Sequence, residues 1–247
     1  MIVDLNHKSG FIPGRADAAA PRVTDQINAA IDAALTKTRM AEERRNYLGA
    51  SIIGDPCARR VALRYLADSL PDEIRVLRIF ETGRALEALL ADWTRRAGFA
   101  LVTEDPRTGR QFEFVDGPVA GHSDGVIVTG PQIAGLRYPL LWEAKTCSDK
   151  SWNELVKLGV RAARPLYYGQ TQLYLAHFRI EACLLSAINK NDQSLYHEIV
   201  PFDLAEAQRL TDRAVEIWRA IEAGQQPPIT VSETLCRHCE FRAACYG

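Results

Sequence analysis

The sequence lacks a charge excess of either sign: 30 lysines and arginines stand against 31 acidic residues, for a formal net charge of −1. Without a basic excess, any nucleic-acid-binding face has to be local. The chain also lacks an apolar run long enough to span a membrane, and its first residues lack a signal-peptide core. We therefore expect a soluble, cytoplasmic protein with no membrane partner.

Internal repeats and low-complexity blocks are also missing, while a hydrophobic content of 47% is enough for a real core. The 247 residues fit one large domain, or a domain with an appended subdomain. Apolar periodicity predicts helices over about 25–46, 56–68, 72–97, 150–159, 165–178 and 203–223. Short apolar runs between turn residues predict strands near 99–103, 111–115, 119–128, 139–146, 181–189 and 194–201. This order indicates an α/β fold in which a mixed sheet is flanked by helices.

We divide the chain into three parts. Residues 1–70 are an N-terminal arm, irregular over 1–24, and a helical segment, and residues 71–202 are the core. Residues 203–247 are a C-terminal helix and a cysteine-rich end, separated by the break at Pro227-Pro228.

A charged pair lies at the end of the apolar strand predicted near 139–146. Alternate side chains of a strand share a face, so Glu143 and Lys145 point together while Trp142 and Ala144 point the other way. A buried glutamate and lysine cost free energy unless they are paired, bound to a metal or used in chemistry. A Glu-x-Lys triplet is also common on a solvated strand face, where it makes an ordinary salt bridge.

An aspartate follows the apolar run 119–121. Asp124 stands beside Gly125, which allows a tight backbone. Hard cations such as Mg²⁺ prefer carboxylate oxygens and also bind substrate phosphate. Asp124 and Glu143 could therefore hold a metal, and Lys145 could orient a water and stabilise charge developing on a phosphate. These residues are candidates for metal-assisted cleavage of phosphodiester bonds.

Two further features accompany these acids. Glu87, four residues after Gly83, lies inside the apolar helix predicted over 72–97, where an ordinary exposed acid would also fit. The helix predicted over 165–178 carries a stripe of residues with polar tips, namely Tyr167, Gln170, Tyr174 and His177. Such a stripe either supports a site or packs as an aromatic face with satisfied polar ends.

Six cysteines are present, and in a reducing compartment closely spaced cysteines favour metal over disulfide. The candidate ligands of one soft metal or cluster are Cys57, Cys236, Cys239 and Cys245. A structural zinc site fits the same ligands, and His238 could replace one thiolate. We interpret Cys147 and Cys183, which lie on apolar strand-like segments, as buried structural thiols.

Basic residues gather in three places that could contact phosphate. They are Arg59, Arg60 and Arg64, then Arg75, Arg78 and Arg84, and finally Lys157, Arg161 and Arg164. Aromatic side chains that could stack on single-stranded bases are Trp152, Tyr167 and Tyr168. Our candidates for DNA binding are Arg59, Arg60, Arg84 and Tyr167. Each basic set also fits a solvated helix face, and each aromatic side chain also fits a core.

The order of these residues resembles the PD-(D/E)XK nuclease superfamily in its RecB-like exonuclease branch. The likeness is closest to the four-cysteine exonucleases of phages and CRISPR systems. The matching pattern is Gly83-x-x-x-Glu87, Gly121-x-x-Asp124, Glu143-x-Lys145 and Gln170-x-x-x-Tyr174. The resemblance implies a restriction-endonuclease-like core with a helical, cysteine-clasped cap. Many relatives carry histidine at the position of Glu87, although glutamate also supplies oxygen ligands.

The resemblance also implies roles for individual residues. The ligands of Mg²⁺ or Mn²⁺ would be Glu87, Asp124 and Glu143. The catalytic lysine would be Lys145, and Gln170 and Tyr174 would support the site or contact DNA. The four cysteines would bind a [4Fe–4S] cluster, with zinc as the alternative.

The implied function is metal-dependent DNA hydrolysis that is exonucleolytic and favours single strands or DNA ends, with endonuclease activity also open. The protein would work in a bacterial, archaeal or phage-infected cell, with a recombination or CRISPR-adaptation protein as a partner. The alternative from another class is a non-catalytic DNA- or partner-binding subunit that keeps a zinc-stabilised, nuclease-like fold.

Overall fold

The computed structural model describes residues 22–42, 45–67, 73–230 and 232–246. The chain forms two compact units, of which the first comprises Met1–Glu43 and Asp72–Arg78 and the second Arg44–Pro71 and Ile79–Gly247. The irregular arm predicted over 1–24 lies almost entirely outside the described residues. The three-part division at residues 70 and 202 is based on where the candidate functional residues lie, and it stays a prediction.

The predicted helices are all present in the structure, with some changes at their ends. The helices of the described chain are α1 (Val23–Met40), α2 (Ala50–Ile53), α3 (Ala58–Leu66), α4 (Ile74–Arg96), α5 (Asp149–Ala163), α6 (Pro165–Phe178), α7 (Leu204–Glu222), α8 (Glu233–Arg237) and α9 (Arg242–Tyr246). Helix α1 stops at Met40 instead of near 46. Helix α5 runs past its predicted end at Gly159, which has a φ of 71° and kinks the helix instead of ending it. Glu198 accepts the N–H of Val160 at 2.8 Å and so satisfies a donor that the kink exposes.

The predicted strands are also present, with one correction. The strands of the described chain are β1 (Leu48–Gly49), β2 (Leu101–Val102), β3 (Glu104–Asp105), β4 (Arg110–Gln111), β5 (Glu113–Asp116), β6 (Val119–His122), β7 (Gly125–Ile127), β8 (Leu140–Cys147), β9 (Ala182–Asn189) and β10 (Leu195–Pro201). The prediction of one strand over 119–128 is wrong, because β6 and β7 belong to different sheets. The strand ends before Asp124, where the chain bends. The carboxylate of Asp124 accepts the N–H of Ala144 on β8.

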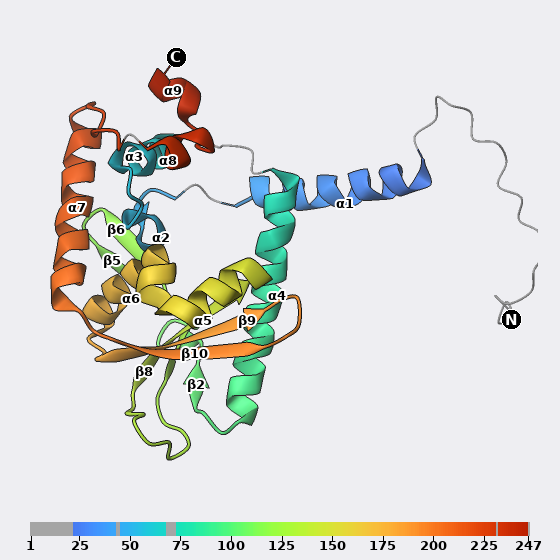
Figure 1. Ribbon diagram of the computed structural model, residues 1–247, viewed down its shortest axis with the longest axis vertical. Helices are drawn as coiled ribbons and strands as arrows, with labels where there is room; N and C mark the ends of the chain where they lie inside the picture. The colour runs from blue at the N-terminus through green and yellow to red at the C-terminus, as the bar shows by residue number, and fades with distance from the viewer. Residues whose placement is uncertain (1–21, 43–44, 68–72, 231, 247) are drawn as a thin grey trace, which may run out of the picture. The chain divides into compact units, whose positions relative to one another are not determined.

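The largest sheet is mixed, as predicted, and has the strand order β10-β9-β8-β7-β2. Strands β8 and β9 are parallel, and the other neighbours are antiparallel. Helices α5 and α6 lie across one face (Figure 1), where Leu141 and Leu185 pack with Leu173 of α6. On the other face, Trp142 packs with Leu90 of α4. The second unit therefore has a mixed α/β fold with helices on both faces of the sheet.

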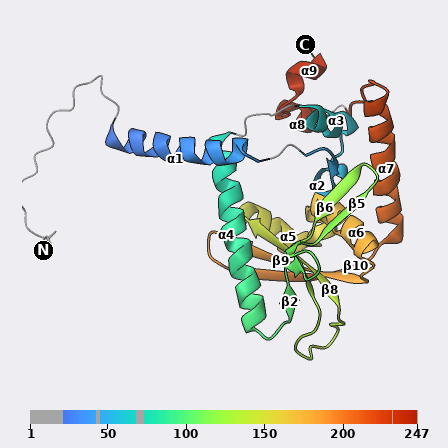
Figure 2. The same cartoon turned by 180° about the vertical axis from the view of Figure 1, so that it is seen from behind.

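The smaller sheet, β1-β6-β5, stands beside the helices that carry the candidate residues. Figure 2 shows the β5–β6 hairpin next to α2 and α6. Phe114 of β5 contacts Tyr174 of α6 edge to face, with ring centroids 5.8 Å apart. This sheet therefore packs against α6 at the candidate residue Tyr174.

In the first unit, α1 buries no side chain among the described residues. The apolar spacing that predicts this helix is present, yet Ile27 is 55% exposed and Ile31 is 50% exposed. Arg78 forms an ion pair with Asp32 of α1. In the described part of the chain, no helix has the length and apolar character needed to cross a membrane.

Candidate active site and cysteine cavity

Strand β8 carries the predicted charged pair into the interior beneath α6. Glu143 is 1% exposed and the side chain of Lys145 is 15% exposed. The ammonium of Lys145 donates to Glu143 Oε1 at 2.5 Å. Trp142 points to the opposite face and donates to Ser186 Oγ at 3.2 Å. The predicted alternation is confirmed, and the pair is buried, unlike a solvated strand face.

The bend between β6 and β7 places Asp124 next to this pair. Asp124 Oδ2 accepts the N–H of Ala144 at 2.8 Å, which fixes the carboxylate one residue from Glu143. The following residue, Gly125, passes close to β2. A Cβ at Gly125 would lie 2.7 Å from the carbonyl oxygen of Val102, so a side chain would push this bend away from the sheet.

Helix α6 closes the site from above with part of the predicted stripe. Gln170 Oε1 accepts from Lys145 Nζ at 3.4 Å, and Gln170 Nε2 donates to the hydroxyl of Tyr174 at 2.9 Å. Lys145 Nζ also lies 4.9 Å from the centre of the Tyr167 ring, a cation–π contact. His177, the fourth residue of the stripe, instead stacks on Phe114 with a centroid distance of 4.0 Å.

The acids share an environment that disfavours their charged forms. Burial, followed by the charge of Asp124, raises the pKa of Glu143 to about 8. Burial and the charge of Asp124 also raise the pKa of Glu87 on α4 to about 7. Burial alone would lower the pKa of Lys145, but the carboxylates of Glu143 and Asp124 raise it above its ordinary value. The site contains three carboxyl groups and one lysine, so its acids outnumber its base. A bound cation would offset the excess negative charge of the ionised carboxylates.

The donor set of this acidic site suits a hard divalent cation. Glu143 Oε2 is buried and has no hydrogen-bond partner among the described residues, and Asp124 and Glu87 add further carboxylate oxygens. Across the described ranges, no group of three or more His, Cys, Asp and Glu side chains is already arranged to hold a metal. Lys145 occupies the other oxygen of Glu143, so Oε2 is the oxygen of this residue that a cation would reach.

Four cysteines that are far apart in the sequence of the second unit line one cavity. They are Cys57 before α3, Cys236 in α8, Cys239 after α8 and Cys245 in α9. All four are free and partly exposed. A backbone N–H of Ser232 and the hydroxyl of Tyr246 lower the pKa of the Cys236 thiol. His238 is not among the described residues that line this cavity.

The two remaining cysteines are buried, as predicted. Cys147 is 2% exposed and Cys183 is fully buried. Burial, with the charge of Glu143 as the next cause, raises the pKa of the Cys183 thiol well above its ordinary value. Both residues pack within the larger hydrophobic cluster.

The structure also gives positions for the DNA-binding candidates. Arg59 Nε donates to the carbonyl of Pro227 at 2.8 Å, and Arg60 pairs with Asp55 and Glu240. Arg84 pairs with Glu81 at 2.5 Å. Tyr167 contacts Lys145. Roles of these residues in DNA binding stay predictions.

The two other aromatic candidates for base stacking have partners inside the fold. Tyr168 is buried and donates to Asp203 at 2.9 Å, whereas Trp152 packs edge to face against Tyr196.

The fold and the buried charged pair define an α/β protein with a candidate acidic active site, and solved structures share this fold. The chain matches no protein-family model, and no curated protein matches it. It is similar to the crystal structure of SSO0001, with a TM-score of 0.56 and 18% identity over 90% of this chain and 97% of that one. At this identity, the likeness concerns the fold.

Two further similar structures are of an alkaline exonuclease. The likeness to LHK-Exo from Laribacter hongkongensis has a TM-score of 0.47 and 12% identity, and covers 78% of this chain and 93% of that chain. The likeness to LHK-Exo in complex with dAMP has a TM-score of 0.40 and 14% identity, and covers 71% and 91%.

Proposed function

We propose that this protein is a deoxyribonuclease that depends on Mg²⁺ or Mn²⁺ and hydrolyses phosphodiester bonds at Asp124, Glu143 and Lys145. The observation that carries the proposal is the buried carboxylate of Glu143, with one oxygen on Lys145 and the other without a partner among the described residues. A purely structural salt bridge does not account for the second acid, the partly buried Asp124, beside this pair. The preference for single strands or DNA ends follows from the motif resemblance.

The metal would be held by Asp124 and Glu143, with Glu87 as the third ligand. When bound, it supplies Lewis acidity toward a phosphoryl oxygen and lowers the pKa of water. Lys145 keeps its positive charge because two carboxylates raise its pKa, and its ammonium stabilises negative charge that develops on the phosphate.

The residues of α6 hold Lys145 in place for this task. Gln170 accepts a hydrogen bond from its ammonium, and Tyr174 in turn fixes the amide of Gln170. The ring of Tyr167 covers the ammonium. These contacts exclude bulk water, so the electrostatic effect of Lys145 is stronger than at an exposed position.

We also propose that the four cysteines bind a [4Fe–4S] cluster. Two features support this proposal: the four thiols line one cavity, and Cys57 reaches it from the opposite end of the second unit. Thiolates are the ligands that iron–sulfur clusters and zinc prefer, and Cys236 already has a lowered pKa. The choice of iron over zinc follows from the motif resemblance.

We expect protein purified without oxygen to contain iron and acid-labile sulfide, and Cys57→Ser to lose both. Removal of one ligand from a site that joins two distant segments also removes free energy of folding, so this variant should be less soluble. The matched controls are Cys147→Ala and Cys183→Ala, which lie outside the cavity and should keep the wild-type metal content. Elemental analysis that finds one zinc and no iron would replace the cluster with zinc. Full metal content in Cys57→Ser would remove Cys57 from the site.

The preference for DNA ends is tested by comparing linear and circular single-stranded DNA of the same sequence. With Mn²⁺, we expect the linear DNA to be degraded and the circular DNA, which has no end, to persist. Equal degradation of both would identify an endonuclease. Retention of both DNAs in a gel-shift assay without any cleavage would instead identify a DNA-binding subunit that keeps the fold.

A further inference from the structure

The tail that carries three of the cysteines is joined to the segment around Cys57 by contacts that need no metal. The hydroxyl of Thr230 donates to the carbonyl of Pro56 at 2.7 Å. Arg59 of α3 donates to the carbonyl of Pro227 at 2.8 Å. Both pictures of the whole chain show α3 and α8 side by side (Figures 1 and 2). The segments 56–59 and 227–230 therefore contact each other next to the cysteine cavity, which Thr230 lines.

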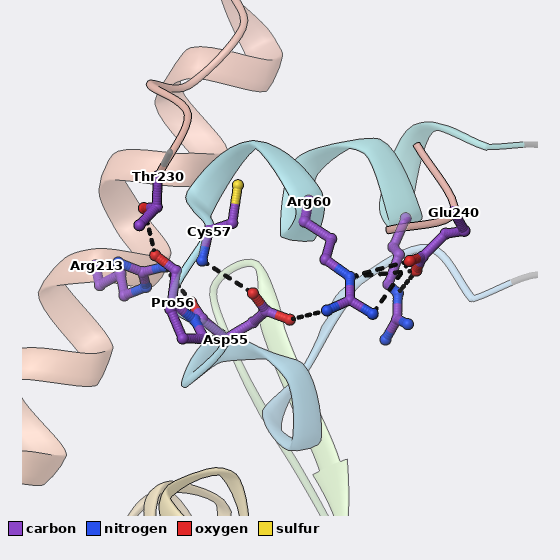
Figure 3. A network of polar contacts seen from close by, with 8 residues as sticks. Asp55, Pro56, Cys57, Arg60, Arg213, Thr230 and Glu240 are labelled. Carbon is purple, nitrogen blue, oxygen red and sulfur yellow. Dashed lines mark hydrogen bonds and ion pairs between the residues drawn. The ribbon is translucent and has the colours of Figure 1, made fainter. Parts of the chain in front are cut away.

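A buried aspartate fixes the backbone at Cys57. Asp55 is 5% exposed, and its Oδ1 accepts the N–H of Cys57 at 2.9 Å. Its other oxygen, Oδ2, accepts from Arg60 Nη1 at 3.2 Å (Figure 3). Arg60 is in the first turn of α3, so Asp55 joins the start of this helix to the guanidinium.

The same guanidinium reaches across to the tail. Arg60 Nε and Nη2 both approach Glu240 Oε2 at 3.1 Å, and Arg64 Nε contacts Glu240 Oε1 at 2.6 Å. Glu240 directly follows Cys239 in the sequence. Arg60 thus bridges two carboxylates, one that holds Cys57 and one beside Cys239 (Figure 3).

The bridge requires an arginine. Its planar guanidinium presents several N–H groups in fixed directions, and here three of its nitrogens contact two separate carboxylates. A lysine has a single ammonium and cannot reproduce this geometry. The side chains of Arg60 and Glu240 are only 24% and 26% exposed, so water and salt weaken their attraction less than that of a surface pair.

We propose that Arg60 and Glu240 form an ion-pair clamp that holds the C-terminal tail on α3 before metal is bound, and thereby positions Cys239 with Cys57. In this account both residues are positioning residues of the cysteine site and do not touch the metal. A tail that is already held raises the effective concentration of its thiols at Cys57, because the loop between them is closed. The part that concerns metal loading rests on the proposed thiolate site, whereas the part that concerns tail attachment does not.

The test compares Glu240→Gln and Arg60→Lys with the control Arg64→Lys. Glu240→Gln keeps the side-chain shape and removes the charge, and Arg60→Lys keeps a charge and removes the fork. Arg64 makes one contact through one nitrogen, which a lysine can replace. Hydrogen exchange is followed by mass spectrometry in the full chain after chelation and reduction, and metal per chain is measured before chelation.

We expect amide exchange over 227–246 in metal-free protein to rise about tenfold in Glu240→Gln and Arg60→Lys, as loss of a charged hydrogen bond allows more frequent opening. Arg64→Lys should stay within about twofold of wild type by the same reasoning. Peptides from β8 and α6 should exchange at the wild-type rate in all variants, which shows that the fold is intact. The metal content should fall in the first two variants only.

Unchanged exchange over 227–246 in both Glu240→Gln and Arg60→Lys would overturn the clamp. Faster exchange with full metal content would overturn its positioning role. A wild-type protein with neither iron nor zinc would contradict the proposed cofactor, yet the exchange rates of the metal-free variants would still decide whether the tail is clamped.

Discussion

Lys145→Ala is expected to lower the rate of DNA cleavage by roughly 100- to 1000-fold, the usual effect of removing one preorganised electrostatic contact in an active site. The side chain of Lys145 is 15% exposed, and its ammonium is held by Glu143, Gln170 and the ring of Tyr167. It therefore has a fixed position and a permanent charge. The measurement is kcat for labelled single-stranded DNA at saturating Mn²⁺.

The control for this variant is Lys190→Ala, an exposed lysine that follows β9. It should change kcat by less than about twofold, because removal of one solvated charge has little effect. Thermal unfolding checks that Lys145→Ala still folds. A folded Lys145→Ala that cleaves at the wild-type rate would show that β8 is not the catalytic strand.

Glu143→Gln is expected to abolish Mn²⁺ binding and to remove part of the stability loss that metal-free wild type undergoes as the pH rises through about 8. Burial raises the pKa of Glu143 from 4.5 to about 8, so the folded state holds a proton that the unfolded chain has released. The stability that this proton contributes is fully present below pH 4.5 and is lost as the pH rises through about 8. Glutamine does not titrate, so the stability of Glu143→Gln relative to wild type should rise from pH 5 to pH 9, on top of a pH-independent cost of removing the ion-pair partner of Lys145.

Urea unfolding across this pH range measures the difference, with Glu104→Gln, at an exposed position of β3, as the control. Mn²⁺ should raise the unfolding temperature of wild type and leave that of Glu143→Gln unchanged, since amide oxygen lacks the charge that a hard cation needs. Equal stabilisation of both proteins by Mn²⁺ would mean that the metal binds elsewhere.

The sequence predicted those features that depend on local periodicity. Alternation along β8 placed Glu143 and Lys145 on one face, and helical spacing brought Gln170 and Tyr174 together. Each of these two predictions concerns residues two to four positions apart within a single strand or helix. The four cysteines were grouped from spacing and resemblance, and they line one cavity in the structure.

Features that depend on contacts between distant segments were missed. The strand expected over 119–128 changes sheets at Asp124, because a side chain there bonds to the backbone of β8. Glu240 went unnoticed since its two arginine partners lie on α3, far away in sequence. Asp55 offered a local signal: an aspartate two residues before a helix N-cap region commonly bonds to nearby backbone N–H groups. The predicted helix at 25–46 was found, but its apolar spacing did not foretell its exposure.

The most direct test of the central claim is degradation of end-labelled linear single-stranded DNA by wild type and Asp124→Asn, assayed side by side with Mn²⁺ and with chelator. Asp124→Asn keeps the side-chain oxygen that accepts the Ala144 N–H and removes the negative charge next to Glu143. We predict that wild type releases labelled nucleotides only with Mn²⁺ and that Asp124→Asn releases none under either condition. Release at the wild-type rate by folded Asp124→Asn, or by wild type in chelator, would contradict a metal-dependent nuclease site at Asp124, Glu143 and Lys145.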